Sequence, residues 1–459
     1  MTTATTAQES RSIIRRIFRP RRYFRAAVYM SLGGFLNGYD TGSIGSITEM
    51  PTFQTSIAVL SPTMRGLTVS FLLFMGAIPS LLAGLLADKY GHVRIVLAGA
   101  VSFTIGAALE AASSDLAMLL VGRSLVGIGE GLYLGNLNVY ICEIAPRARR
   151  GQLVAMPQAL VTLGTCLGYF TCYGTIRIPG EMAWRLPFVI QAAGGALLAL
   201  ACLFLPESPR WLMARSRAQE AVHHMELLDF GQDEIQQDLR DIPQFDWHAV
   251  MDIFRKKYRF RTTLALFILG MVQLCGIDGV LYYAPTLFAQ AGLPADTASF
   301  IASGVSAVLM FAISVPAFLL ADRWGRRTIV FWGGVLLAGS MAIIGSLYAS
   351  ESVISGHGAG RWFVITLIFV FALTYVSTWG IVGKIYASEI QPAHTRATAN
   401  ALAQGLNFFT NFLTAFITPI FLAQSSFGPY FLFAGLTTFT LAVLLIYMPE
   451  TRGRSLESI

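Results

Sequence analysis

One stretch decides the fold: Gly84-Leu-Leu-Ala-Asp-Lys-Tyr-Gly-His-Val-Arg94, which returns as Phe318-Leu-Leu-Ala-Asp-Arg-Trp-Gly-Arg-Arg-Thr328. Each copy joins two long apolar segments and contains an acidic residue, a glycine and several basic residues. The repeat indicates that the chain consists of two homologous membrane-embedded halves. A duplication of this kind is typical of transporters, whose substrates bind between the repeats near the middle of the bilayer.

The composition indicates an integral membrane protein. The chain has 459 residues, of which 54% are hydrophobic and only 13% are charged, whereas a soluble protein carries about 25% charged residues. The charges cluster between apolar runs of about 20 residues, long enough to cross a hydrocarbon core of roughly 30 Å. These runs lack the period-two alternation of barrel strands, so we expect an all-α protein. The twelve predicted spans cover approximately residues 27–47, 64–87, 95–114, 117–140, 152–174, 185–205, 262–287, 298–321, 327–348, 362–387, 397–422 and 428–448.

The distribution of charge predicts the orientation in the membrane. Seven arginines lie within residues 11–25, and further basic clusters alternate with loops, such as 48–63 and 290–297, that contain no Lys or Arg. The positive-inside rule then places both termini and the long central loop in the cytoplasm. Topology and contact with anionic membrane lipids account for the net charge of +7, so nucleic-acid binding is not expected. The plasma membrane is the default compartment.

Two further motifs repeat about 240 residues apart and define the domains. Glu143-Ile-Ala-Pro recurs as Glu389-Ile-Gln-Pro, and the Pro-Glu motif at Pro206 recurs at Pro449. The region between the halves mixes charged residues with Leu and Met, which favours a short helical domain over a flexible linker rich in Gly and Ser. We expect a cytoplasmic Arg-rich N-terminus (1–26), a six-helix bundle (27–205), a cytoplasmic helical linker domain (206–261), a second six-helix bundle (262–448) and a cytoplasmic C-terminus (449–459).

Six motifs in order along the chain resemble those of the sugar porter family of the major facilitator superfamily. They are Gly38–Gly42, Asp88–Arg94, Gly122-Arg123, Pro206–Leu212, Gln273–Tyr283 and Pro449–Glu457. The resemblance covers nearly the whole chain. The residues within the motifs are most similar to those of fungal members of the family. It implies two pseudo-symmetric six-helix bundles, monomeric function and transport by alternating access. The sequence contains no phosphate loop or nucleophile elbow, and its five cysteines lack metal-ligand spacing, so we expect no enzyme activity, metal or cofactor.

Asp40 and Arg123 are the candidates for proton coupling. Asp40 lies in the first predicted span and Arg123 near the start of the fourth, which runs in the opposite direction, so both fall in the outer half of the bilayer. A buried carboxylate is costly unless it is paired or protonated. Separation of the pair would therefore favour proton uptake, and the resemblance implies the same role. The alternative is a static structural ion pair.

The repeated loops and Pro-Glu motifs supply candidate gating residues. Their acidic and basic side chains could hold one state of the transport cycle, and the resemblance implies an inner network of salt bridges. The alternative is a role in topology and loop stability alone. The candidates are Asp88, Arg94, Glu143, Arg150, Glu207 and Arg210 in the first half and Asp322, Arg326, Glu389, Arg396, Glu450 and Arg452 in the second.

Sugar recognition needs amides and carboxylates for the hydroxyl groups and aromatic faces for the ring. The resemblance implies that Gln158, Gln273 and Asn407 bind substrate, and Tyr282, Tyr283 and Trp379 are aromatic candidates. Each of these residues could instead serve helix packing.

The chain also departs from the family pattern. Asp278 stands where the family has Asn, and Lys384 stands where an aromatic residue lines the sugar cavity. Asn37 replaces a common Phe, and Glu130 occupies a slot that is normally apolar. Lys384 could extend to the membrane surface, or it could meet a carboxylate, either that of Asp278 or one on the substrate.

We therefore expect a proton-coupled symporter for a sugar or related polyol, driven by the proton gradient. The main alternative is a proton-coupled porter for a sugar acid or polyol acid, such as a hexuronate or quinate. A facilitative uniporter and a non-transporting sugar receptor remain further alternatives. The short segment after the last span argues against the receptor, because such receptors often carry a long cytoplasmic tail.

Overall fold

The computed structural model describes residues 21–146, 149–231, 235, 254–294, 298–320, 325–353, 358–391 and 396–449. Throughout these residues the regular secondary structure is helical. The first half contains α2 (Arg22–Glu49), α3 (Pro51–Ser56), α4 (Pro62–Tyr90), α5 (His92–Ala112), α6 (Leu116–Ile144), α7 (Arg150–Val154), α8 (Met156–Thr175) and α9 (Met182–Phe204). The central segment contains α10 (Pro209–Ala214) and α11 (Ala218–Leu227). The second half contains α14 (Arg259–Gln273), α15 (Ile277–Tyr282), α16 (Ala284–Gln290), α17 (Ala298–Leu320), α18 (Arg326–Ala349), α19 (Ala359–Ser377), α20 (Trp379–Glu389), α21 (Arg396–Gln424) and α22 (Gly428–Tyr447).

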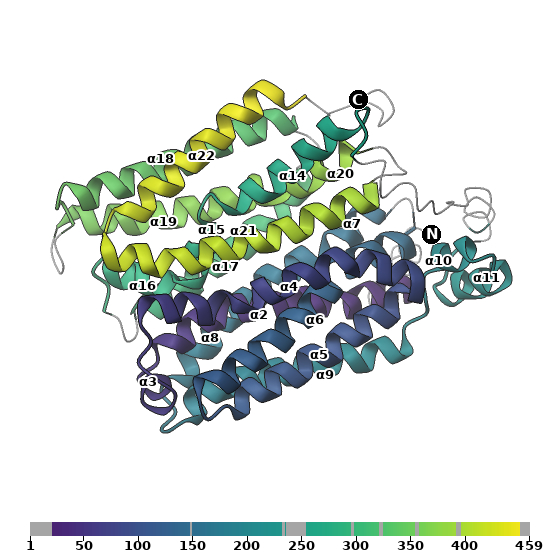
Figure 1. The fold of residues 1–459 in the computed structure, drawn as a ribbon, viewed down its shortest axis with the longest axis horizontal. Coiled ribbons are helices and arrows are strands. Elements are labelled where there is room, and N and C mark those ends of the chain that lie inside the picture. Colours follow the sequence, from purple (N-terminus) through teal and green to yellow (C-terminus); the bar gives the residue numbers. More distant parts are fainter. Residues whose placement is uncertain are drawn as a thin grey trace, which may run out of the picture.

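The expected twelve membrane spans are confirmed. Ten helical segments in the described part of the chain are long and apolar enough to cross a bilayer, and α2 and α17 complete the twelve. The two halves lie side by side as bundles (Figure 1) and meet along two seams, where α4 packs against α21 and α8 packs against α17. The fold is therefore the two-bundle architecture that the repeat indicates.

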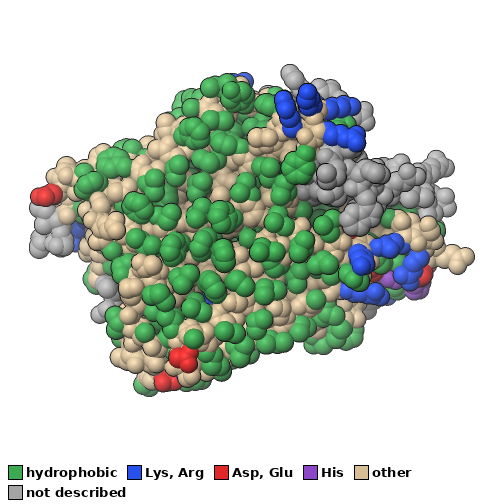
Figure 2. Space-filling model, viewed as in Figure 1, with side chains coloured by type: hydrophobic (Ala, Val, Ile, Leu, Met, Phe, Trp, Pro, Cys, Tyr) green, Lys and Arg blue, Asp and Glu red, His purple; other side chains and the backbone are tan. Residues whose placement is uncertain are grey.

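The surface separates a broad apolar face from charged ends. In Figure 2 hydrophobic side chains cover the middle of the visible face, and Lys and Arg gather mainly at the end where α10 and α11 project. We call this the α10 end, and we call the opposite end, where α3 and α16 lie, the far end (Figure 1). An apolar belt between two polar ends is what a bilayer requires.

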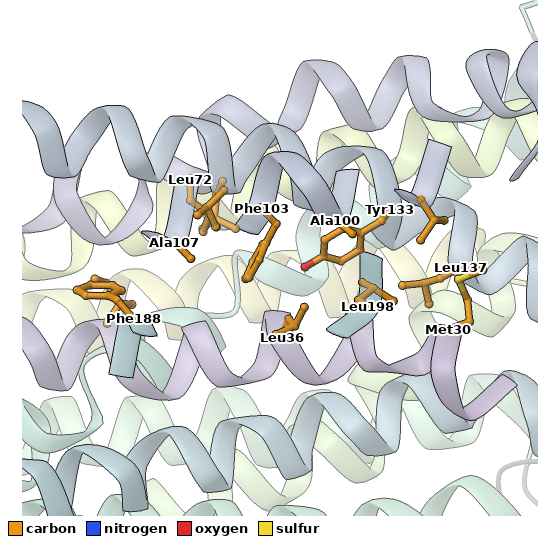
Figure 3. Packing of buried hydrophobic residues seen from close by; sticks show 14 of the residues in the cluster. Met30, Leu36, Leu72, Ala100, Phe103, Ala107, Tyr133, Leu137, Phe188 and Leu198 are labelled. Carbon is orange, nitrogen blue, oxygen red and sulfur yellow. The ribbon is translucent and has the colours of Figure 1, made fainter. Parts of the chain in front are cut away.

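Helices of the first half pack closely around a shared core. Figure 3 shows Leu36 of α2, Phe103 of α5, Tyr133 of α6 and Leu198 of α9 converging on one region, and the rings of Phe103 and Tyr133 lie 6.0 Å apart between centroids. Small residues allow this approach: a Cβ added at Gly38 of α2 would lie 1.9 Å from the carbonyl oxygen of Val161 in α8. Such small-residue contacts are a main source of stability between membrane helices.

Two spans that were expected to be continuous are broken. The segment expected at 262–287 is divided into α14, α15 and α16, and the segment expected at 362–387 into α19 and α20. Gly276, which lies between α14 and α15, has a positive φ of 96°, a conformation that does not continue a right-handed helix. Thr378, with φ −126° and ψ −85°, separates α19 from α20. Broken helices near the middle of transporter bundles leave backbone groups free to face a binding site.

The described part of the central segment, residues 206–231 and 235, contains a small helical unit, and the expected domain bounds stay a prediction. Leu212, Met213, Ala221, Met225 and Ile235 form its own apolar cluster, and Leu228 joins the core of the first half. Ser208 caps α10 by accepting a hydrogen bond of 3.3 Å from the backbone nitrogen of Trp211. This unit is thereby held against the α10 end of the first bundle.

Candidate substrate and ion-coupling site

Asp40 and Arg123 form a two-point ion pair inside the first half. Arg123 Nη1 lies 2.6 Å from Asp40 Oδ1, and Nη2 lies 3.3 Å from Oδ2. The Asp40 side chain is 1% exposed and that of Arg123 is fully buried. The sequence predicted that these residues could meet, and the structure brings them together.

Further groups of the first half surround this pair. Arg123 donates to the backbone oxygens of Thr68, at 3.2 Å, and Val69, at 2.7 Å. Gln191 of α9 donates to Asp40 Oδ1 at 3.1 Å. Glu110 of α5 lies 3.9 Å from Arg123 Nη1. Sequence reasoning did not single out Gln191 and Glu110, although an acid within an apolar span is itself a signal of function.

Glu130 and Asn37 lie on the α10 side of the ion pair. Asn37 Nδ2 donates to Glu130 Oε2 at 3.3 Å, and Glu130 is fully buried while Asn37 is half-buried. This bond joins two polar side chains of the first half, one from α2 and one from α6. The polar region therefore extends from Arg123 toward the middle of the bundle.

The second half contributes an amide cluster. Gln273 Nε2 donates to Asn407 Oδ1 at 3.2 Å, and Asn407 Nδ2 donates to the backbone oxygen of Leu269 at 2.8 Å. The hydroxyl of Tyr375 donates to Gln273 Oε1 at 3.2 Å. The structure thus brings together two predicted substrate residues and adds Tyr375, whose position in a broken span the sequence did not reveal.

The other predicted substrate residues are distributed more widely. Gln158 is half-buried in α8, and Asp278 is buried at the start of α15. Tyr282 and Tyr283 are buried close to α2 and α21, and the Tyr283 hydroxyl donates to the backbone oxygen of Ala415 at 2.9 Å.

Trp379 and Lys384 both lie on α20. Trp379 Nε1 donates to the backbone oxygen of Val330 in α18 at 3.0 Å, within the second half. The side chain of Lys384 lies outside the described part of the structure, and its predicted role stays a prediction.

Three gating candidates of the first half, Asp88, Glu143 and Glu207, lie around the start of α10. Glu207 Oε1 accepts from the backbone nitrogen of Val93 at 3.1 Å, and Glu143 pairs with His92 at 3.4 Å while accepting from Ser208 Oγ. The backbone oxygen of Asp88 accepts from Trp211 Nε1 at 2.8 Å.

The remaining gating candidates are only partly described. Arg94 is exposed, Arg210 is half-buried and Arg326 is buried at the start of α18. The side chains of Arg150, Glu389 and Arg396, and the residues Asp322, Glu450 and Arg452, lie outside the described part of the structure.

At the far end, Arg65 of α4 joins the two halves. Its guanidinium pairs with Glu49 of α2 and donates to Thr286 Oγ1 of α16 at 2.8 Å. Thr286 in turn donates to Glu49 Oε1 at 2.9 Å, and Arg65 lies 5.2 Å from the centroid of the Tyr283 ring. We call Glu49, Arg65, Thr286 and Tyr283 the far-end latch. Polar contacts across the halves at one end are what a closed gate requires.

The described residues contain no group of three or more His, Cys, Asp or Glu side chains that could hold a metal ion. What they offer instead is a buried acid paired with a cation, which can exchange a proton, and a cluster of amides and a phenol, which can bind hydroxyl groups.

Comparison with known proteins identifies the family. Residues 26–459 match the family described as sugar (and other) transporter. A high glucose sensor of Saccharomyces cerevisiae is 30% identical over 94% of this chain, which spans 59% of that protein's length. The glucose transporter GlcP of Staphylococcus epidermidis is 28% identical, over 94% of each chain.

A solved structure supports the fold. The xylose transporter XylE from E. coli, in a partially occluded inward-open conformation, superposes with a TM-score of 0.79 at 22% identity. The match covers 95% of this chain and 99% of that one. Family and fold are those of membrane transporters and not of enzymes. The chain belongs to the sugar (and other) transporter family and has the twelve-helix fold of the major facilitator superfamily.

Proposed function

We propose that the protein is a proton-coupled symporter that moves a sugar or related polyol across the membrane by alternating access. The buried ion pair between Asp40 and Arg123 carries this proposal. A protein whose fold this chain shares is described as a proton:xylose symporter, and the family assignment supports the substrate class.

Proton coupling follows from the cost of leaving either member of the pair alone in the membrane. While Asp40 is ionised, its two-point contact with Arg123 stabilises both charges. When the helices move and the contact opens, the carboxylate is stabilised by binding a proton, because the neutral acid has a far smaller desolvation cost. Binding and release of one proton at Asp40 is thereby linked to the change of conformation.

The substrate binds between the halves in this proposal. Gln273, Asn407 and Tyr375 offer amide and hydroxyl groups from the second half, and the half-buried Asn37 of α2 and Gln158 of α8 are the amide candidates of the first. Amides are suited to neutral hydroxyl groups because each supplies both donors and an acceptor. Asp278 is the nearest acid in the sequence to this cluster and would accept a hydroxyl bond.

Orientation and gating follow from charge. The α10 end carries the basic clusters, so we propose that it faces the cytoplasm and that the far end faces outward. Glu143, Glu207 and the Asp88 loop then form the inner gate with their counterparts in the second half, and the far-end latch forms the outer gate. Function as a monomer in the plasma membrane is part of the same proposal.

Uptake in cells that lack their own sugar transporters tests the proposal. Labelled glucose, xylose, galacturonate and quinate are supplied separately, and the pH of a lightly buffered medium is recorded. Accumulation of a neutral sugar with alkalinisation is the expected result. Uptake of galacturonate or quinate without uptake of the neutral sugars would show that the substrate is a sugar acid or polyol acid. Lys384 would then be the first candidate for binding the substrate carboxylate. Sugar binding without any uptake would indicate a receptor.

A further inference from the structure

Glu110 is a buried acid that the proton-coupling pair does not account for. It lies in the last turn of α5, and its side chain is fully buried. In the described part of the chain neither carboxylate oxygen of Glu110 has a hydrogen-bond partner. Its closest charged neighbour is Arg123, whose Nη1 lies 3.9 Å from Glu110 Oε1 and 2.6 Å from Asp40 Oδ1. One guanidinium nitrogen thus faces two carboxylates at different distances.

The packing of α5 against α6 holds Glu110 in this place. A Cβ added at Gly122, the residue before Arg123, would lie 2.7 Å from Glu110 Cγ. The methylene stem of Glu110 therefore occupies the space that Gly122 leaves open. Gly122 directly precedes Arg123. The carboxylate of Glu110 can therefore reach the guanidinium of Arg123 with a small change of rotamer.

The charged groups around Glu110 come from α2 and from the helices packed against α5, which are α4, α6 and α9. α2 supplies Asp40, α6 supplies Arg123 and Glu130, and α9 supplies Arg185, whose Nη1 donates to the backbone oxygen of Ala111 at 2.6 Å and whose Nη2 pairs with Glu181. α4 supplies the backbone oxygens of Thr68 and Val69, which accept from Arg123.

The charge balance of this cluster requires protons. Two buried acids, Asp40 and Glu110, lie within 4 Å of the guanidinium of Arg123, and a third, Glu130, is fully buried on the same helix as Arg123. If all three were ionised, two negative charges would remain uncompensated in the membrane interior, which is strongly unfavourable. Asp40 has the short two-point contact, so Glu110 is an acid on which a proton resides in the arrangement seen here.

We propose that Glu110 is the second counter-ion of Arg123 and keeps its charge paired while Asp40 holds the transported proton. The proposal rests on the proposed function. The O–H bond on Glu110 breaks as an O–H bond forms on Asp40, directly or through water, and the ion pair of Arg123 passes from Asp40 to Glu110. Arg123 keeps all of its protons, the total charge is unchanged, and the cluster carries one exchangeable proton.

This role makes Glu110 a positioning residue for protonation of Asp40, and the sign of its effect follows. In Glu110→Gln, protonation of Asp40 leaves Arg123 without a counter-ion, so Asp40 takes up its proton only at higher proton concentration. We expect the midpoint of the pH dependence of substrate uptake to move to lower pH by about one unit. The matched control is Glu220→Gln, on the exposed face of α11, which should leave the midpoint unchanged. An unshifted midpoint in Glu110→Gln would overturn the proposal.

A second measurement does not depend on transport. Thermal unfolding is recorded for purified Asp40→Asn, Glu110→Gln and the double variant. Each single variant leaves Arg123 one counter-ion, whereas the double variant leaves it with neither Asp40 nor Glu110. We expect the melting temperature of the double variant to fall by more than the sum of the two single shifts. Additive shifts would contradict the shared pairing.

The two measurements also separate this proposal from the proposed function. Wild-type uptake that is independent of pH would rule out proton coupling. The melting temperatures of the single and double variants would still decide whether Glu110 and Asp40 share Arg123 as their partner. Coupled wild-type uptake with an unshifted Glu110→Gln midpoint would remove the role of Glu110 alone.

Discussion

Arg123 holds Asp40 by two nitrogen–oxygen contacts, of 2.6 and 3.3 Å, in a place where neither side chain reaches solvent. Two charges buried in a membrane bundle are stable only together. The pair therefore resists opening while Asp40 is ionised and opens readily once Asp40 is neutral. In the proposed function, this geometry links protonation of Asp40 to the change of conformation.

Removal of Arg123 alone should destabilise the protein. Arg123→Ala leaves Asp40 buried without its cation, and loss of one partner of a buried pair costs about 3–5 kcal/mol. Thermal unfolding in detergent measures the loss. Asp40→Asn combined with Arg123→Ala should recover part of this stability, because no unpaired acid then remains in the pair. A double variant less stable than Arg123→Ala would contradict the charge argument.

The far-end latch should control the outer gate. Arg65→Ala removes the guanidinium that joins Glu49 to Thr286, and a partly exposed pair of this kind contributes about 1 kcal/mol. We expect the outward-open population to rise about fivefold. Its measure is the labelling rate of a cysteine at Asn37 by an impermeant thiol reagent, in a chain whose native cysteines are replaced. Arg217→Ala, at the exposed residue that precedes α11, is the control, and equal labelling of both variants would exclude the latch.

Tyr375 should contribute to substrate affinity through its hydroxyl. Tyr375→Phe keeps the ring and removes the bond to Gln273 Oε1, and a hydrogen bond of this kind contributes about 1 kcal/mol. We expect the free energy of unfolding to fall by about 1 kcal/mol and the KM for uptake to rise, because Gln273 is no longer held in place. Tyr29→Phe, at an exposed position of α2, should leave the KM unchanged. An unchanged KM in Tyr375→Phe would show that the substrate does not bind at the cluster of Gln273, Asn407 and Tyr375.

Close helix packing at Gly38 can be tested with a matched glycine. A Cβ at Gly38 would lie 1.9 Å from the Val161 oxygen, whereas one at Gly135 in α6 meets nothing within 4 Å. Gly38→Ala should destabilise the fold by about 1–3 kcal/mol, because α2 and α8 must separate. Gly135→Ala should be neutral or stabilising by about 0.5 kcal/mol. Equal melting temperatures for the two variants would show that the α2–α8 contact is not tight.

The sequence predicted the spans because their length and apolar composition are set by the bilayer. It also predicted that Asp40 and Arg123 meet, since both fall at one depth. The break at Gly276 was missed because a glycine within an apolar run does not reveal its φ angle. Hydropathy does not say which face of a helix points inward, so the bond from Trp379 to Val330 of α18 could not be foreseen, and the role of Trp379 in substrate binding stays a prediction. Glu110 was overlooked because it lies at the edge of a predicted span.

Proton coupling at Asp40 is tested most directly by the accumulation ratio of Asp40→Asn in cells that lack other sugar transporters. Wild-type cells should concentrate the labelled substrate above its external level and alkalinise a lightly buffered medium, and Glu220→Gln should behave in the same way. Asp40→Asn should do neither, while exchange of internal for external substrate continues. Accumulation above the external concentration by Asp40→Asn would show that Asp40 does not carry the proton.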